Sequence, residues 1–508
     1  MHLADLLLAL EYQQIELSVK DGALSYRAPA GAFTEALLEE VKRHKQDLIG
    51  LIEKALAKAG RSAPGGRDAG ELPLTPWHGW YLETFDPTGH RWSVTRHAQL
   101  GADADLERVS AAVHIVMNRY DTFRQRLYRK HDGSWALRML ETAGEPKIVL
   151  SDATGNREQC LLDIQKDVER TLSMVDGPVA YVALCKDREV GDVIVVNLHH
   201  NIVDAYCVDA IVSDMVDVYR MLSGDRAVDG QARAECSYAS YTESLHRYMS
   251  GPMFLARSLS YWGEFARAGT PGIPFDFAGG QHTANNSRIV TLYVGADVLS
   301  SRNASVVNDA LLIAAAAAIA DWSGQAAVAI DVEHHGRGGH IPGIDFLEVV
   351  GPTTFKFPMR FEIGPDSLSS PVSLEALRKR ITDVTQYGLG YGFLRYLHPD
   401  PQVRSDFQRM QRPQVFLNNR TTLFVKGGDN DDGAAAPPRS SGIFRIESHS
   451  DPELHDPYSH ELLIECDRSR DGIEIALIYS EKIHKDETIV GLAETLLSKL
   501  RRLGEICV

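Results

Sequence analysis

The most regular hydrophobic pattern in the chain lies between residues 193 and 219. Val193 to Val196 form an unbroken apolar run rich in β-branched side chains, which predicts a strand covered on both faces. Beyond Asp204, apolar residues recur at helical spacing up to Tyr219, which predicts an amphipathic helix. Because a strand that runs directly into a helix projects side chains from a rigid element, we expect a functional site at this junction.

A second pattern predicts a small separate module at residues 1–58. Leucines at helical spacing near the start predict a short helix, and alternating runs at 15–19 and 23–27 flank an Asp-Gly turn, as in a β-hairpin. Thr34 is the expected N-cap of an amphipathic helix that closes the module. The residues that follow are polar and rich in glycine, so we expect a flexible linker at 59–71.

Composition and charge narrow the class of protein. The chain has 508 residues, of which 44% are hydrophobic and 24% are charged, and this is the balance of a globular protein with several domain-sized units. Its net charge of −16 argues against a nucleic-acid partner, because phosphate binding needs a basic face. We find no unbroken run of 18 apolar residues and no basic stretch at the start, so we expect no membrane span, no signal peptide and a cytoplasmic location.

The cysteines show no C-x-x-C spacing, so they predict neither a zinc cage nor a disulfide framework. We expect reduced and mostly buried thiols at six positions: Cys160, Cys185, Cys207, Cys236, Cys466 and Cys507.

Two adjacent histidines stand where the predicted strand ends. Imidazole can take and return a proton near neutral pH, which makes it the usual general base of enzymes. Because neighbours on a strand point to opposite faces, His199 and His200 cannot both reach one cavity. We take His200 as the candidate catalytic base and His199 as structural. Asp204, four residues further on, is expected to orient the junction through a buried ion pair.

Two other interpretations of the histidine pair stay open at this point. A histidine on an apolar strand is often a core residue whose nitrogens are satisfied by neighbours. A metal site is less favoured, because adjacent histidines point apart and no third ligand follows at the spacing of an H-E-x-x-H motif.

The junction resembles a family signature. His199, His200, Asp204 and Ala205 match the HHxxxDG motif of nonribosomal peptide synthetase condensation domains, which belong to the chloramphenicol acetyltransferase-like acyltransferases. Ala205 stands where the family usually has glycine. If the backbone needs a positive φ there, alanine costs about 1 kcal/mol.

The resemblance implies an α/β (α+β) fold: a pseudodimer of two lobes in a V with a central tunnel, preceded by a small helix-hairpin-helix docking domain. The lobes would comprise residues 72–246 and 247–508, with His200 midway along the tunnel. Side chains implied to line the tunnel are Tyr206, Cys207, Glu333, His335, Arg337, Gly351 and Thr353.

Other stretches line up with the condensation family in chain order. Residues 74–82 occupy the place of its opening motif, and 119–127 resemble its RHxxLRTxF motif, which implies that Arg124 pairs with Asp204 as structural support. Residues 349–355 resemble a later motif beside the tunnel. A further segment, rich in glycine, aspartate and proline, matches the place of the family's mobile latch loop, at 426–442.

The N-terminal module resembles the TubC-type β-hairpin docking domains of synthetase subunits. The resemblance implies capture of a short acidic and hydrophobic C-terminal tail on an upstream carrier protein, by β-augmentation or by helix-in-groove binding. Lys20, Arg27, Lys42 and Lys45 would supply the positive charge.

The expected activity is acyl transfer from a carrier-protein thioester to a nucleophile. Motifs for substrate activation or carriage are absent from the sequence, so both substrates would come from partners or from solution. We expect no bound cofactor, because the partner carrier protein supplies the 4′-phosphopantetheine. The layout resembles the stand-alone release enzymes of enacyloxin-type polyketide assembly, which implies a free small carboxylic acid whose hydroxyl is the acceptor. Amide formation, with an amine or aminoacyl-carrier acceptor, stays open.

His200 would accept the acceptor's proton, and backbone N–H groups at 204–206 would stabilise the developing oxyanion.

Two rival functions stay open. The stretches at 333–337 and 391–396 resemble related epimerisation domains, in which a glutamate and a histidine exchange an α-proton. The other rival is an inactive docking scaffold, suggested by Ala205 and by the altered motif that begins at Arg119.

Overall fold

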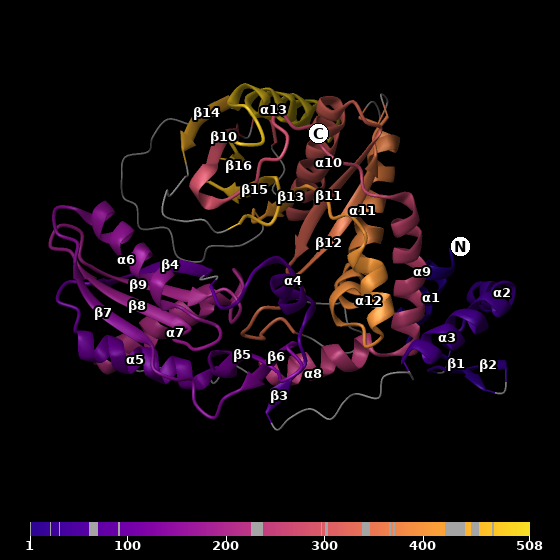
Figure 1. The fold of residues 1–508 in the computed structure, drawn as a ribbon, viewed down its shortest axis with the longest axis horizontal. Helices are drawn as coiled ribbons and strands as arrows, with labels where there is room; N and C mark the ends of the chain where they lie inside the picture. The colour runs from indigo at the N-terminus through magenta and orange to yellow at the C-terminus, as the bar shows by residue number, and fades with distance from the viewer. Residues whose placement is uncertain are drawn as a thin grey trace. The chain divides into compact units, whose positions relative to one another are not determined.

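The structure is a computed structural model (Figure 1). It describes residues 2–20, 22–29, 31–59, 70–89, 92–224, 237–295, 297–299, 303–337, 346–364, 367–368, 371–421, 442–448, 457–469 and 472–507. Most of the linker expected at 59–71 and nearly all of the latch loop expected at 426–442 lie outside these residues. The chain divides into two compact units: one of Met1–Ser260, His335–Thr354 and Tyr396–Arg404, the other of Tyr261–His334, Phe355–Arg395 and Ser405–Val508.

The N-terminal module of the first unit has the predicted first helix and hairpin, followed by two helices. Its elements are α1 (Leu3–Tyr12), β1 (Glu16–Lys20), β2 (Ala23–Arg27), α2 (Glu35–Arg43) and α3 (Lys45–Ala59). The strands pair antiparallel, from Glu16 opposite Arg27 to the turn. Thr34 caps α2, because its hydroxyl accepts from the N–H of Leu37 at 3.2 Å. The single closing helix that the pattern predicted is interrupted at His44, whose backbone leaves the helical conformation.

A buried ion pair anchors this module within the first unit. Glu11 of α1 pairs with Arg257 of α9 (Pro252–Ala268); the side chain of Arg257 is buried and that of Glu11 is 11% exposed. The hydroxyl of Tyr248, on α8 (Tyr238–Met249), donates to Glu11 at 3.4 Å and accepts from Arg257 at 3.2 Å. Because loss of one partner leaves the other charge buried and uncompensated, these contacts fix α1 against α8 and α9.

The main sheet of the first unit has the strand order β4-β9-β8-β7. Strand β9 is buried at every residue and pairs antiparallel with both neighbours. Its side chains alternate between two clusters, so that Val193 and Val195 face α6 while Ile194 and Val196 face α5 and α7. This confirms the strand predicted to be covered on both faces. The elements are β4 (Ser93–Gly101), α5 (Leu106–Arg119), β7 (Lys147–Asp152), α6 (Arg157–Thr171), β8 (Ala180–Lys186), β9 (Asp192–His199) and α7 (Cys207–Leu222).

A smaller sheet and helix α4 complete the first unit. Its order is β3-β6-β5, from β3 (Glu71–Leu72), β5 (Gln125–Arg129) and β6 (Trp135–Met139), with α4 at Pro76–Thr84. The returning segment at 396–404 packs on α4, since a Cβ added to Gly79 would lie 2.4 Å from the side chain of Tyr396.

The second unit is built on a sheet of order β12-β11-β13-β15-β16-β10-β14. The central pairs β11-β13 and β13-β15 are parallel and the other pairs are antiparallel. Its strands are β10 (Ser287–Gly295), β11 (Ala327–His334), β12 (Phe355–Glu362), β13 (Val415–Asn419), β14 (Gly442–Ser448), β15 (Leu462–Arg468) and β16 (Gly472–Ser480). Its helices are α10 (Ala304–Ser323), α11 (Pro371–Gly392) and α13 (Asp486–Cys507), and the boundary between the units falls within α12 (Pro401–Gln408), after Arg404.

Helix α10 is the one helix among the described residues whose length and apolar composition would suit a membrane span. Its apolar stretch is Ser305–Ser323, and 72% of that stretch is buried inside the protein. The helix therefore has the burial of a core helix, and its apolar side chains are used in packing.

Four buried histidines make the stability of the protein depend on pH. Burial lowers the pKa of His78, His282, His460 and His484 to about 4 in each case. An unfolded histidine titrates near pH 6.5, so between pH 6.5 and pH 4 the unfolded chain binds more protons than the folded chain. We expect the free energy of unfolding to fall as the pH decreases through this window, with a slope of at most about 1.4 kcal/mol per pH unit for each histidine.

Denaturant unfolding of the full chain, carried out at about pH 7 and again at about pH 5, measures this slope. Replacement of His78 by Gln should reduce the slope, whereas the same change at exposed His131 should leave it as it is. A free energy of unfolding that stays constant over the window would contradict the prediction.

Candidate active site at the end of strand β9

The imidazole of His200 stands where β9 ends and packs against two tryptophans. Its ring centroid lies 4.1 Å from that of Trp92, with 34° between the planes, and 4.9 Å from that of Trp77, with 28° between the planes. The N–H of His200 donates to the carbonyl of Trp92 at 2.9 Å. The residue is half-buried, so it is not sealed in solid packing, while neighbouring His199 is fully buried.

His199 points away from this surface into the core. Its Nδ1 accepts from the N–H of Asn201 at 3.1 Å, and its ring meets that of Tyr81 edge to face at 6.3 Å. Two adjacent histidines thus have different surroundings, as the alternation of a strand requires.

The carboxylate of Asp204 is fully buried and accepts hydrogen bonds on both oxygens. Oδ1 accepts from the N–H groups of Tyr206 at 3.1 Å and Cys207 at 2.9 Å, which shapes the turn into α7. Oδ2 accepts from Arg337 Nη2 at 2.7 Å, and from the N–H and the hydroxyl of Thr353 at 3.2 and 3.1 Å. Burial alone would raise the pKa of Asp204, but the charge of Arg337 and these donors hold it below its ordinary value.

Among the described residues, Arg337 and not Arg124 is the arginine that pairs with Asp204. The pair implied by the family motif is therefore replaced by one from a distant part of the chain. Arg337 also donates to the carbonyls of Val349 at 2.6 Å and Gly351 at 3.1 Å, so it ties 346–354 to the junction. Arg124 is half-buried at the end of a 3-10 turn, and its carbonyl accepts from Leu140. Arg124 does not pair with Asp204 because both carboxylate oxygens of Asp204 already accept hydrogen bonds from other donors.

The turn also uses backbone groups that we expected to face a substrate. The N–H of Tyr206 donates to Asp204, and the N–H of Asp204 lies 3.4 Å from Cys207 Sγ. These two groups are engaged inside the turn, which argues against the predicted oxyanion role at 204–206. Burial raises the pKa of the Cys207 thiol, so Cys207 is a packing residue and not a thiolate.

Ala205 carries no backbone strain. Among the described residues, the non-glycine residues with a positive φ are Gln14 and Asp103. The alanine in place of the family's glycine therefore has an ordinary backbone conformation, and the cost considered from the sequence does not arise.

Position 351 requires a glycine. Its φ is 151°, and a Cβ added there would lie 2.1 Å from the ring of Tyr238. Tyr238 in turn donates its hydroxyl to the carbonyl of Pro352 at 2.9 Å. A side chain at position 351 would push 346–354 off α8 and disturb the carbonyl that Arg337 binds.

The structure brings most of the implied tunnel residues together in the first unit. Cys207, Gly351 and Thr353 contact the Asp204–Arg337 pair directly. Tyr206 is 50% exposed, and the Arg337 guanidinium lies 4.8 Å from its ring centroid. His335 is exposed, and its Nδ1 accepts from the N–H of Arg337 at 3.0 Å.

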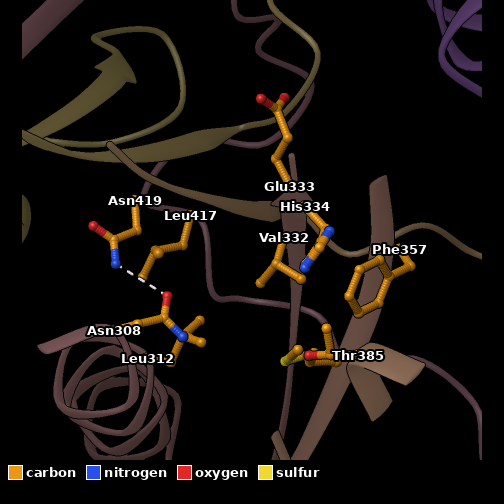
Figure 2. A pocket seen from close by; sticks show the side chains of 10 residues that line it. Asn308, Leu312, Val332, Glu333, His334, Phe357, Thr385, Leu417 and Asn419 are labelled. Carbon is orange, nitrogen blue, oxygen red and sulfur yellow. Dashed lines mark hydrogen bonds between the residues drawn. The ribbon is translucent and has the colours of Figure 1, made fainter. Parts of the chain in front are cut away.

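Glu333 does not join this group. It belongs to the second unit, where it pairs with buried Lys356 at 3.4 Å. Figure 2 shows its carboxylate pointing away from the other labelled side chains around a cavity of about 70 Å³. The cavity lies between α10, α11 and strands β11 to β13, and an Asn419–Asn308 hydrogen bond of 3.0 Å crosses its wall. Its volume suits a few water molecules, and not an acyl chain.

The four cationic residues assigned to docking are all exposed. Lys20 ends β1 and Arg27 ends β2, so both lie on the hairpin, whereas Lys42 and Lys45 lie on the closing helices. Lys42 pairs with Glu39 at 2.7 Å, which already neutralises part of its charge. The hairpin cations are therefore the stronger candidates for an acidic partner.

Sequence reasoning missed the role of Trp92. Strand pairing places Ser93 opposite His199, and this register brings Trp92 beside His200. A tryptophan directly before a strand was the available signal, but the register was needed to interpret it. In the part of the chain that the structure describes, no three His, Cys, Asp or Glu side chains are grouped so that they could hold a metal ion.

Comparison with known proteins agrees with this architecture. The condensation domain family matches residues 68–507, and the TubC N-terminal docking domain matches residues 3–53. One of the linear gramicidin synthase proteins of Brevibacillus parabrevis is 26% identical over 452 residues, which is 85% of this chain but 6% of that protein. Chondramide synthase of Chondromyces crocatus is 25% identical over 475 residues, covering 91% of this chain and 12% of that protein. The chain thus spans a small part of these relatives.

Solved structures show the same fold. The epimerization domain from the third module of tyrocidine synthetase B has a TM-score of 0.70 at 21% identity, over 88% of this chain and 99% of that one. The structure describing condensation domain-mediated chain release from the enacyloxin polyketide synthase has a TM-score of 0.64 at 18% identity, over 99% and 95%. These matches confirm the predicted α/β condensation-domain fold. The chain belongs to the condensation domain family, whose members are acyl-transferring enzymes, and it carries a TubC-type docking domain at its N-terminal end.

Proposed function

We propose that this protein transfers an acyl chain from the phosphopantetheine thioester of a carrier protein to the hydroxyl of a small carboxylic acid. The observation that carries the proposal is the half-buried imidazole of His200, held at the end of a fully buried strand. A base in such a place is oriented by the core yet accessible to a reactant. The solved structure for condensation domain-mediated chain release from the enacyloxin polyketide synthase has a similar fold, which supports a role in chain release. A cytoplasmic location belongs to the same proposal.

In the proposed step, His200 takes the proton of the acceptor hydroxyl as its oxygen attacks the thioester carbonyl carbon. The carbon–sulfur bond then breaks, and the proton passes from the imidazolium to the departing sulfur. The products are an ester and a free carrier thiol, so atoms and charges balance. Because the imidazole must be neutral to accept the proton, the rate should fall on acidification. Asp204 and Arg337 support this step by holding the turn that follows His200.

Epimerisation is the second candidate, because the chain shares the fold of a solved epimerization domain. The glutamate that such a reaction would use is Glu333, and its carboxylate is engaged by buried Lys356. Acyl transfer is therefore the better supported function. Loss of deuterium from the α-carbon of a carrier-bound substrate, with no acceptor present, would favour epimerisation instead.

Replacement of His200 by Ala should reduce acyl transfer by roughly 10² to 10⁴-fold, the usual contribution of a positioned base. The measurement is intact-mass analysis of an acyl-loaded carrier with free hydroxy acids and amines as acceptors. His114, a surface histidine that pairs with Glu145, is the matched control, and its Ala variant should keep full activity. Wild-type turnover in the His200→Ala enzyme would refute the role of His200 as the general base.

Replacement of Arg337 by Leu should destabilise the first unit by about 3–5 kcal/mol, because it leaves the Asp204 carboxylate buried without its ionic partner. Replacement of Arg124 by Ala should change stability by less than about 1 kcal/mol, as for a half-buried residue outside the network. Urea unfolding followed by tryptophan fluorescence measures both. An equal loss of unfolding free energy in the two variants would mean that the Asp204–Arg337 pair does not stabilise the junction.

Charge reversal of the hairpin, with Lys20→Glu and Arg27→Glu together, should raise the carrier concentration needed for half-maximal turnover and leave the saturated rate unchanged. These residues are exposed, so the change removes attraction to an acidic tail without disturbing the core. Truncation of the module is a poorer test, because it would leave Arg257 buried without Glu11. Arg188→Glu, also on the surface of the first unit, is the control. The docking assignment fails if the double variant and the Arg188→Glu control change the carrier concentration for half-maximal turnover to the same extent.

A further inference from the structure

The surroundings of His200 are unusually aromatic. Trp77, Trp80 and Tyr81 come from α4, Phe85 follows that helix, and Trp92 precedes β4. Their rings form a continuous cluster, with centroid distances of 5.3 Å for Trp77–Trp80 and 5.9 Å for Trp80–Trp92. Two members of the cluster contact the imidazole of His200: Trp77 stacks on it, and the ring of Trp92 is tilted against it.

The two indoles lie on adjacent sides of the imidazole and not on opposite faces. Their own centroids are 5.5 Å apart, and they lie 4.9 and 4.1 Å from the His200 centroid. The planes are inclined by 28° and 34° to the imidazole plane, so both contacts are made largely by ring faces. This is the distance and orientation at which the face of an indole attracts a cation.

Both tryptophans are tied to the short stretch of chain that carries the histidine, Trp77 by its indole N–H and Trp92 by its backbone carbonyl. The Nε1–H of Trp77 donates to Oδ1 of Asn201 at 2.9 Å, and Asn201 is fully buried directly after His200. The carbonyl of Trp92 accepts the N–H of His200 at 2.9 Å. These two bonds fix the backbone at His200 and Asn201 relative to Trp92 and Trp77, and the imidazole is then held between them by its ring contacts.

We propose that Trp77 and Trp92 are positioning residues for His200: their ring faces hold the imidazole in one orientation and stabilise the imidazolium that forms when it takes the proton. The inference rests on the proposed role of His200 as the base. The positive charge exists only after proton transfer begins, so an interaction with that charge is stronger in the transition state than in the ground state. Such an interaction raises kcat and leaves substrate affinity unchanged.

The test compares Leu and Phe at each position in the full-length protein. Leu keeps an apolar side chain but has no aromatic face, and Trp77→Leu or Trp92→Leu should lower kcat about tenfold, within the range of a desolvated cation–π contact. The KM values for the acyl carrier and for the acceptor should stay within about twofold, since neither substrate is bound more weakly. Trp77→Phe and Trp92→Phe should recover most of the lost rate, because a smaller aromatic face is restored.

Trp80→Leu is the matched control. Trp80 is equally buried in the same helix and belongs to the same cluster, but its ring contacts are with Trp77, Trp92 and Phe85. Its loss should lower the unfolding midpoint and leave the kcat of the folded enzyme unchanged. If the variants of buried Trp77 do not fold, those of half-buried Trp92 carry the comparison.

The results separate this inference from the proposed function. Wild-type kcat in Trp92→Leu, or a Phe variant as slow as the Leu variant, would overturn the positioning role and reduce the cluster to packing. If His200→Ala is inactive while both Leu variants keep their full rate, only this inference fails. If His200→Ala stays active, the base itself is refuted and the proposed function fails with it.

Discussion

The first unit depends on one buried charge, the carboxylate of Asp204. Its side chain and that of its partner Arg337 are each 1% exposed, so neither can be solvated by water. A carboxylate in the interior is tolerated only when donors surround it. The fold meets this requirement with the N-terminal turn of α7, with Arg337 and with Thr353, which come from separate parts of the chain. The need to satisfy Asp204 thus gives a physical reason for the return of 335–354 to the first unit.

The same requirement limits what the motif can do chemically. Because Asp204 takes the N–H of Tyr206, and Cys207 is buried as a neutral thiol, the turn after β9 acts as a support and offers no nucleophile. The proposed chemistry therefore rests on His200, which directly precedes this turn. Aromatic rings that touch the imidazole then matter more than they would in a site with several charged groups. In the proposed function, the buried Asp204–Arg337 pair is the rigid support and the half-buried His200 is the base.

Local features were predictable from the sequence, and long-range pairings were not. An unbroken apolar run predicted strand β9, and helical spacing predicted helix α7. The Asp-Gly turn predicted the docking hairpin, and Thr34 was the expected cap of the helix that follows it. The motif match named the wrong arginine, because a matched position fixes a residue type and not its contact. Arg337 follows Asp204 by more than a hundred residues, and only the folded chain joins them. Trp92 was missed for a similar reason, since its place beside His200 is set by strand register.

The docking module changes how tail capture would act on catalysis. A module on a loose linker raises the local concentration of its partner to a value set by linker length. Here Glu11 of the module pairs with buried Arg257, so the module belongs to the same compact unit as His200. A captured tail would therefore hold the carrier protein in a restricted region around that unit, because α1 cannot leave without exposing a buried ion pair. If the proposed tail capture takes place, the Glu11–Arg257 pair would set the geometry in which the acyl donor is delivered.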